Sequence, residues 1–460
     1  MGKEELRDLP SVHQLMEKVA VRVTAAPPSA LREACRESIE EERQAILAGQ
    51  KARDEEELAL LTLERLRKGL LPSMESVINA TGVMLHTAIG RAPMPEVAVE
   101  AATRAASGYT VLQWNRETGR RGHRDAHVEG LLTEITGAEA ATVVNNNAGA
   151  TLLVLSALCR GREVIVSRGQ LVEIGGAFRI PEVMRQSGAV MREVGCTNRT
   201  HLRDYAEAIS EETAAILRVH PSNYRIRGFS GFPELAEMVA LADEHGLPVI
   251  DDLGAGSLVD LKLFGLPHEP TVQDSLSDGA SVTTSSGDKL IGGPQAGIIT
   301  GSRELVDRIR RHPLARALRV GKMTLSTLAA TLSLFLEERE YIIEHHPVYA
   351  MFAAGREELR ARAVRMLELL SLPEGCRAEA IETESYVGSG SLPDTGIPSA
   401  GIGITAPDAD ALARQLRLAS PAVASRVEDG MLKLDMRTLL PDELEVLAAL
   451  VTRKAGLLWE

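Results

Sequence analysis

A lysine stands among small residues in the stretch Ser285-Ser286-Gly287-Asp288-Lys289-Leu290-Ile291-Gly292-Gly293-Pro294-Gln295, directly after a β-prone segment. Glycines let a backbone take positive φ and approach a ligand closely. A lysine at the mouth of a strand, held in a tight apolar turn, can lose its proton and act as an amine nucleophile. Such an amine can form a Schiff base with pyridoxal phosphate, a cofactor that serves as an electron sink. Taken alone, such a pattern is more often a surface turn that contains a lysine. The rest of the chain therefore has to show whether Lys289 belongs to a cofactor site.

Residues 128–330 alternate short apolar, β-branched runs with helical segments, which predicts a mostly parallel sheet covered by helices on both faces. The chain is therefore expected to be an α/β protein. Ligands of such sheets bind beyond the carboxyl ends of the strands. The candidate strands are Ala141–Val144, Glu163–Ser167, Ala189–Glu193, Ala214–Val219, Pro248–Asp252, Ser281–Thr284 and Gly297–Thr300.

Polar loops follow several of these strands: Asn145–Gly149, His220–Arg225 and Asp251–Gly254, with Lys289 after a later strand. Each loop could be an ordinary helix N-cap, because Asn, Asp and Ser favour that position. Their convergence on one sheet edge with a lysine instead matches the needs of pyridoxal phosphate. An aspartate would keep the pyridine nitrogen protonated, the amide-rich turn would hold the phosphate, and Lys289 would carry the aldehyde.

Two basic segments flank this region. Trp114–Arg124 interleaves four arginines with glycines, and Arg303–Lys322 carries several more cations. In the second segment, Arg316 and Arg319 are three apart, which predicts that they share one helix face. Both segments could be solvated charged surfaces, or they could grip an anion such as a phosphate.

The remaining chain predicts two further domains. Residues 1–75 have helical periodicity, with Ser29 as a candidate N-cap, and form either an oligomerisation bundle or a docking module. Periodicity alone favours the bundle. From residue 326 onward the pattern predicts a smaller α/β domain, so the expected division is 1–75, 76–325 and 326–460.

Composition limits the class of protein. The net charge of −13 argues against a general nucleic-acid coat, although it leaves room for a local basic patch. The four cysteines are far apart, as expected of reduced thiols, and no metal-ligand pattern occurs. No apolar segment is long enough to span a bilayer, and the acidic start does not resemble a signal peptide. We therefore expect a cytoplasmic protein with no membrane partner.

Several motifs distributed along the chain point to one known family. They are Leu9–Val12, Val77–Gly82, Glu117–Gly122, Val144–Ala148, Val166–Gly169, Glu173–Gly176, Phe178–Pro181, Thr197–Thr200, Val219–Tyr224, Asp252–Gly254 and Ser286–Gly297. Together they resemble the bacterial selenocysteine synthase family, the L-seryl-tRNA(Sec) selenium transferases. The similarity extends nearly from end to end, and one departure is Cys196, where the family usually has threonine.

The resemblance implies a fold-type-I, pyridoxal-phosphate-dependent transferase that assembles as a ring-shaped homodecamer of dimers. Such an enzyme converts seryl-tRNA(Sec) to selenocysteinyl-tRNA(Sec) with selenophosphate as the selenium donor, through an aminoacrylyl-tRNA intermediate. The family's N-terminal helical domain recognises the tRNA, which favours the docking interpretation of residues 1–75. The alternative is a related β-eliminase or ammonia-lyase that acts on a small amino acid or amino sugar.

The resemblance also implies roles for individual residues. Lys289 would be the Schiff-base lysine, with Asp252 as the pyridine partner and Asp251 as a weaker candidate. The cofactor phosphate would lie against Asn146, Asn147 and Ala148, and Arg91, Arg316 and Arg319 would receive the phosphate of the selenium donor. The other expected neighbours of the site are Thr197, Asn223, Ser286 and Asp288. The residue that protonates the departing serine hydroxyl is not indicated.

Overall fold

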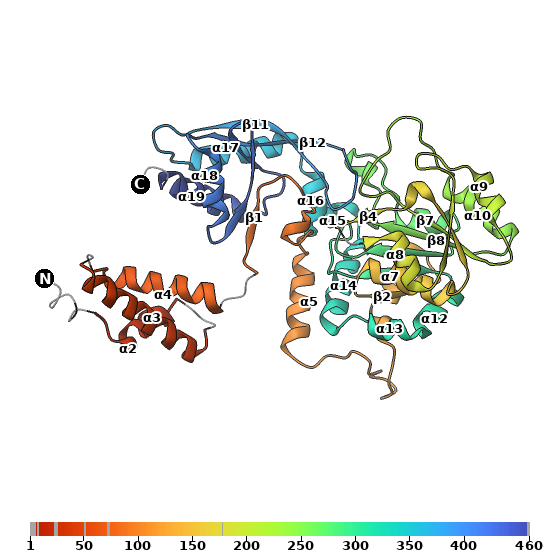
Figure 1. Cartoon of the computed structure of the whole chain (residues 1–460), viewed down its shortest axis with the longest axis horizontal. Helices are drawn as coiled ribbons and strands as arrows, with labels where there is room; N and C mark the ends of the chain where they lie inside the picture. Colours follow the sequence, from red (N-terminus) through yellow and green to blue (C-terminus); the bar gives the residue numbers. More distant parts are fainter. Residues whose placement is uncertain are drawn as a thin grey trace. The chain divides into compact units, whose positions relative to one another are not determined.

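The computed structural model describes residues 6, 9–22, 26–49, 52–70, 74–176 and 178–457, without the side chains of 67–70. The chain forms two compact units, Met1–Ser76 and Val77–Glu460 (Figure 1). The first boundary lies one residue from the expected position. The expected boundary between residues 325 and 326 falls inside helix α14 (Lys322–Ser333), and the further division of the second unit stays a prediction.

The first unit is helical in its described part, as the periodicity predicts. It contains α2 (Val12–Ala20), α3 (Pro28–Leu47) and α4 (Glu55–Leu70), which share a core that includes Leu15, Cys35 and Leu58. The prediction that Ser29 caps a helix is wrong. Helix α3 begins at Pro28, whose fixed φ suits the first helical position and whose missing N–H is not needed there.

The second unit is built around a seven-stranded sheet in the order β2-β10-β9-β8-β7-β3-β6. Neighbouring strands are parallel, except that β10 runs antiparallel to both β2 and β9. All seven expected strands are present, with ends within two residues of the prediction. The strands are β2 (Ala140–Val144), β3 (Glu163–Ser167), β6 (Val190–Val194), β7 (Thr213–Val219), β8 (Val249–Gly254), β9 (Val282–Ser286) and β10 (Gly297–Gly301).

Helices cover both faces of this sheet, because alternate strand residues point to opposite sides. Ile299 belongs to the core beneath α7 (Asn147–Leu158), α8 (Ile180–Ser187) and α12 (Arg303–Arg311). Its neighbour Ile298 joins the opposite core, beneath α6 (Glu129–Thr136), α11 (Val272–Ser277) and α14. Helices α9 (Leu202–Ala208) and α10 (Leu235–Glu244) cover a further core over β7 and β8. This doubly covered sheet is the α/β architecture that the sequence predicts.

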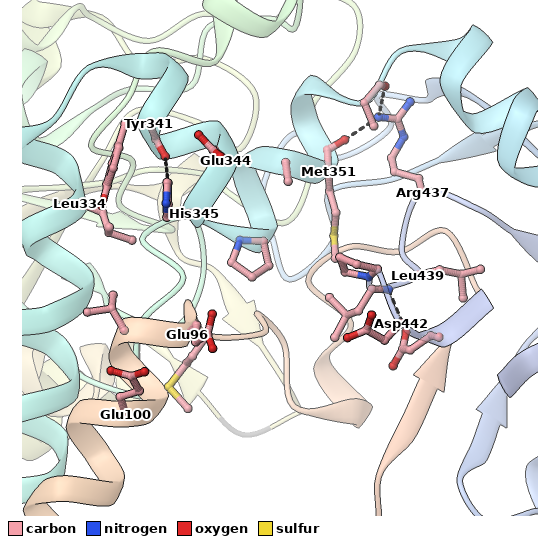
Figure 2. Close-up of a pocket in the computed structure, with 18 of the residues that line it drawn as sticks. Glu96, Glu100, Leu334, Tyr341, Glu344, His345, Met351, Arg437, Leu439 and Asp442 are labelled. Atoms are coloured by element: carbon pink, nitrogen blue, oxygen red, sulfur yellow. Dashed lines mark hydrogen bonds between the residues drawn. The ribbon is translucent and has the colours of Figure 1, made fainter. Parts of the chain in front are cut away.

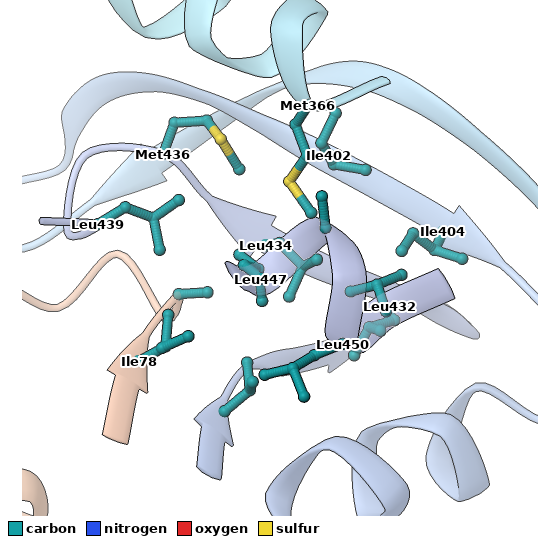
Figure 3. Close-up of a cluster of buried hydrophobic side chains, with 14 of the residues drawn as sticks. Ile78, Met366, Ile402, Ile404, Leu432, Leu434, Met436, Leu439, Leu447 and Leu450 are labelled. Atoms are coloured by element: carbon teal, nitrogen blue, oxygen red, sulfur yellow. The ribbon is translucent and has the colours of Figure 1, made fainter. Parts of the chain in front are cut away.

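The C-terminal segment forms a second, antiparallel sheet in the order β11-β12-β15-β14. One side of this sheet is apolar and packs against the helices of the C-terminal segment. The core between them contains residues such as Ile402, Leu434 and Leu447 (Figure 3). Strand β1 (Val77–Asn79) pairs in parallel with β13 (Ala422–Ala424), and Ile78 enters the same core. The elements are β11 (Arg377–Ser385), β12 (Ile397–Thr405), β14 (Arg426–Glu428), β15 (Met431–Asp435), α17 (Arg356–Leu369), α18 (Ala409–Arg417) and α19 (Glu443–Gly456).

Shorter elements complete the unit. Helix α5 (Glu96–Ser107) packs against α14, and α15 (Arg339–His345) is followed by α16 (Pro347–Ala353). A small hairpin joins β4 (Glu173–Ile174) to β5 (Phe178–Arg179). All four cysteines are free, and no helix among the described residues has the length and apolar character to cross a membrane.

Candidate active site

Lys289 lies in a closed turn between β9 and β10. The backbone N–H of Gly287 donates to Ala296 (2.8 Å), that of Gly293 to Gly287 (2.8 Å), and that of Gly292 to Lys289 itself (2.9 Å). The lysine is 6% exposed, and its amine has no hydrogen-bond partner among the described residues. Burial, followed by the positive charge of Arg91, lowers the pKa of Lys289. The turn therefore holds an amine that is biased toward its neutral, reactive form.

Asp252 lies at the end of β8 on the face covered by α7. Its Oδ1 accepts hydrogen bonds from Asn147 Nδ2 (2.8 Å), Thr284 Oγ1 (3.0 Å) and the N–H of Gly254 (3.3 Å), and its Oδ2 accepts one from Thr151 (3.3 Å). Burial raises the pKa of Asp252 above its ordinary value, although the hydrogen bonds from Asn147, Thr284 and Gly254 and the charge of Lys289 act in the opposite direction. The result is a buried carboxyl that can accept a further hydrogen bond beside Lys289.

Asp251 points to the opposite face of the sheet, because it is the next residue along the strand. It accepts a hydrogen bond from Ser275 (2.6 Å) and pairs with Arg218 (3.1 Å). These contacts belong to the packing of α11 against the sheet. Of the two aspartates, Asp252 is the one that shares a face with the Asn147 loop.

The loop after β2 forms the N-terminus of α7. Asn146 is the N-cap, and its side chain accepts from the N–H of Gly149 (2.8 Å), while Asn147 opens the helix. The N–H groups of Asn147 and Ala148 belong to the first turn, where no carbonyl of the helix itself can accept from them. Together with the helix dipole, they suit a phosphate.

Arg91 reaches the lysine turn from the loop after η1 (Thr87–Ile89). Its guanidinium forms an ion pair with the carboxylate of Asp288 at 2.5 Å, and both side chains are mostly buried. The ion pair orients Arg91, whose charge acts on the amine of Lys289. The structure therefore brings Arg91, Asp288 and Lys289 together, an arrangement compatible with the roles that the family resemblance implies.

Arg316 and Arg319 do not share a helix face, so this prediction is wrong. The short helix α13 (Pro313–Ala317), which starts at Pro313 after the end of α12, contains Arg316 but ends before Arg319. Arg319 lies beyond α13, in a β-bridge with Val144 next to the start of α7.

These two arginines form part of a larger cationic group. Arg124 donates to the carbonyl of Val320 (2.6 Å), and burial together with the charges of Arg319, Arg121 and Arg316 lowers the pKa of Arg124. The basic loop after Trp114 and the basic segment after α12 therefore meet beside the predicted phosphate position. Arg124 is a site candidate that the residue predictions did not single out, although the basic character of its loop indicated it.

The other predicted neighbours have different surroundings. Ser286 is buried at the end of β9, whereas Thr197 and Asn223 are exposed in loops after β6 and β7. Asn223 donates to the carbonyl of Glu173 (3.1 Å). Cys196 is exposed and lies in the same loop as Thr197.

Glu269 is a buried carboxyl near Lys289 that the sequence analysis missed. Its Oε1 lies 3.9 Å from Nδ1 of His220, and the charges of Glu269 and Lys289 act on each other. Burial raises the pKa of Glu269 to about 7. Burial also lowers the pKa of His220 to about 4, so this histidine is neutral and the contact is not an ion pair. Glu269 lies in a loop before α11, where no periodic pattern indicates it.

The residues at this edge fit pyridoxal phosphate. Two buried side-chain oxygens, Asn147 Oδ1 and Ser285 Oγ, have no hydrogen-bond partner among the described residues and could serve polar atoms of a ligand. The buried amine of Lys289 suits the aldehyde of the cofactor, Asp252 suits the pyridine nitrogen, and the start of α7 suits the phosphate.

A separate cavity of 790 Å³ lies between α5, the α15–α16 segment and the residues before α19 (Figure 2). Its lining is strongly acidic, with Glu96, Glu100 and Glu344 among the carboxylates. None of the predicted site residues lines it. We therefore place the candidate site at the lysine turn and not in this acidic cavity.

Comparison with known proteins gives consistent results. The family model described as SelA, L-seryl-tRNA selenium transferase, matches residues 77–440. The L-seryl-tRNA(Sec) selenium transferase of Moorella thermoacetica is 51% identical over 389 residues, 84% of this chain and 83% of that protein. The corresponding protein of Desulfomicrobium baculatum is 47% identical over 453 residues, 96% of this chain and 97% of the relative.

Among solved structures, D-glucosaminate-6-phosphate ammonia-lyase aligns with a TM-score of 0.58 at 22% identity, over 86% of this chain and 99% of that one. At this level of identity, the alignment shows a shared fold.

Proposed function

The chain belongs to the L-seryl-tRNA selenium transferase family, and from this membership we propose that it converts seryl-tRNA(Sec) to selenocysteinyl-tRNA(Sec) with pyridoxal phosphate as cofactor and selenophosphate as selenium donor. The observation that carries the proposal is the buried Lys289, whose amine has no hydrogen-bond partner in the part of the chain that the structure describes, at the sheet edge that also holds Asp252 and the start of α7. The ammonia-lyase alternative has only the shared fold in its favour.

Each of these groups has a task in the proposed reaction. Lys289 would bind the cofactor aldehyde, Asp252 would face the pyridine nitrogen, and the first turn of α7 at Asn147 and Ala148 would hold the phosphate. When bound, pyridoxal phosphate delocalises the electron pair released at the substrate Cα. Lys289 must be neutral to remove the Cα proton, and its burial beside Arg91 favours that state.

The arginines near the lysine turn and near the start of α7 would recognise the anionic selenium donor. Arg91, fixed by Asp288, and the pair Arg316 and Arg319 would receive the anionic selenium donor. We propose Ser286, Thr197 and Asn223 as further neighbours of the cofactor, in agreement with the family pattern.

The first unit would recognise the tRNA. It is a compact helical unit separate from the residues of the candidate site, which all lie in the second unit. We also propose that the protein acts in the cytoplasm as a homodecamer of dimers, as the family resemblance implies.

The decisive test is the reaction of seryl-tRNA(Sec) and selenophosphate with wild type, Lys289→Ala and, as a matched control, the exposed-lysine variant Lys262→Ala. We expect product from wild type and Lys262→Ala and none from Lys289→Ala. Product formation by Lys289→Ala at the wild-type rate would contradict the proposal.

A second test removes the helical unit. A chain of residues 76–460 retains β1 and should still bind the cofactor, which its visible absorbance reports, but should lose affinity for tRNA(Sec). Unchanged tRNA affinity would show that the second unit alone recognises the tRNA.

A further inference from the structure

Glu269 is enclosed by groups from several elements. It is 4% exposed, and the backbone N–H of Leu392, in the loop before β12, donates to its carboxyl. The charged and titratable groups that act on it are Arg225, His268 and Lys289, with His220 at 3.9 Å. None of these forms a hydrogen-bonded ion pair with it in the described structure. A buried carboxyl in such surroundings is stabilised in its protonated form.

The carboxyl also borders free space. Glu269 and His220 line a cavity of 380 Å³ at the carboxyl end of β7, together with residues such as Tyr224 and Arg225. His220 is held there by its backbone N–H, which donates to the carbonyl of Asp252 (2.9 Å). The cavity is therefore adjacent to the strand end that carries the predicted pyridine partner.

The other carboxyl groups at this end of the sheet are already engaged by hydrogen bonds or ion pairs. Asp288 is paired with Arg91, Asp252 accepts four hydrogen bonds, and Asp251 is bound to Arg218 and Ser275. Glu269 differs from them because no side chain among the described residues forms a hydrogen-bonded ion pair with it, so its proton stays available to a group that enters the cavity.

The proposed function creates a need for such an acid, because hydroxide is a poor leaving group. Resting on that function, we propose that Glu269 is the general acid that protonates the β-hydroxyl oxygen of the seryl group as it departs. Lys289 takes the Cα proton, a double bond forms between Cα and Cβ, and the Cβ–O bond breaks with its electron pair leaving on oxygen. The proton from Glu269 completes a water molecule, and neutral His220 lies beside the resulting carboxylate.

The test compares two leaving groups in single-turnover reactions of the full-length holoenzyme. Seryl-tRNA(Sec) requires a proton for its hydroxyl, whereas β-chloroalanyl-tRNA(Sec) releases chloride without one. We expect Glu269→Gln to slow the seryl reaction by ~10²–10⁴-fold, the usual contribution of a general acid, and to leave the chloroalanyl reaction nearly unchanged. The conservative variant Glu269→Asp should retain part of the seryl rate, and Glu244→Gln, at an exposed glutamate, should behave as wild type.

An infrared measurement gives a readout that does not depend on turnover. The wild-type protein, with or without cofactor, should show a carboxylic-acid band that disappears as the pH rises through about 7 and is absent from Glu269→Gln. Equal slowing of both leaving groups, an unchanged seryl rate, or a missing band would each overturn the proposal. If wild type consumes no seryl-tRNA(Sec) at all, the proposed function fails, and the role of Glu269 fails with it.

Discussion

Substitution of Gly292 by alanine should disrupt the turn that carries Lys289. Gly292 has φ +65°, and a Cβ at this position would collide with the imidazole carbon Cε1 of His346. His346 is fully buried, its Nε2 lies 3.0 Å from the carbonyl oxygen of Ile291, and its ring packs against Phe335. The ring therefore has little room to move away.

The expected loss in the free energy of unfolding has two contributions. A residue with a Cβ costs about 1–2 kcal/mol in the left-handed region, and overpacking of a core typically costs about 1–3 kcal/mol more. We expect Gly292→Ala to lower the free energy of unfolding by about 2–5 kcal/mol. Gly246 is a matched control, because it has φ +63° with open space around its Cβ position, so Gly246→Ala should cost only about 1–2 kcal/mol.

Urea denaturation of the two full-length variants and wild type measures this difference, and the visible absorbance of added pyridoxal phosphate reports cofactor binding. Gly292→Ala should lose both stability and cofactor binding, whereas Gly246→Ala should bind cofactor normally. If the two variants are equally destabilised, the contact with His346 does not constrain the lysine turn and the argument fails.

Two further predictions concern the charges at the site. Arg91→Gln should raise the pKa of Lys289, because it removes a neighbouring cation, and so shift the pH profile of cofactor capture to higher pH; an unchanged profile in a stopped-flow measurement would contradict this. Asp252→Asn should weaken cofactor binding by roughly 10–150-fold, because a hydrogen bond to a charged group contributes about 1.5–3 kcal/mol. An absorbance titration measures this affinity. The exposed control Asp243→Asn should bind the cofactor as wild type does.

The central sheet could be predicted from the sequence because most of its strands are buried on both faces, the edge strand β6 being the exception. Each appears as a short apolar, β-branched run, and the polar residues after it mark its carboxyl end. For the same reason, Asn146 could be identified as a helix cap and Lys289 as a strand-end residue.

The arrangement of side chains was harder to predict. Asp251 and Asp252 have the same chemistry, and only the register of β8 against its neighbours decides which one faces Asn147. The error at Arg316 and Arg319 came from continuing a helical period beyond Ala317, where α13 ends. Glu269 could not have been found, because its proximity to Lys289 depends on the path of a loop.

The pairing of β1 with β13 has a consequence for biosynthesis. Val77 is among the first residues of the second unit to leave the ribosome, yet its partner Ala422 is made near the end of translation. The helical unit can fold early, since domains generally fold as they emerge, whereas Ile78 has to remain without its native neighbours during most of elongation. Nascent chains that stop before residue 422 should therefore be substrates for chaperones or proteases even when the seven-stranded sheet is complete.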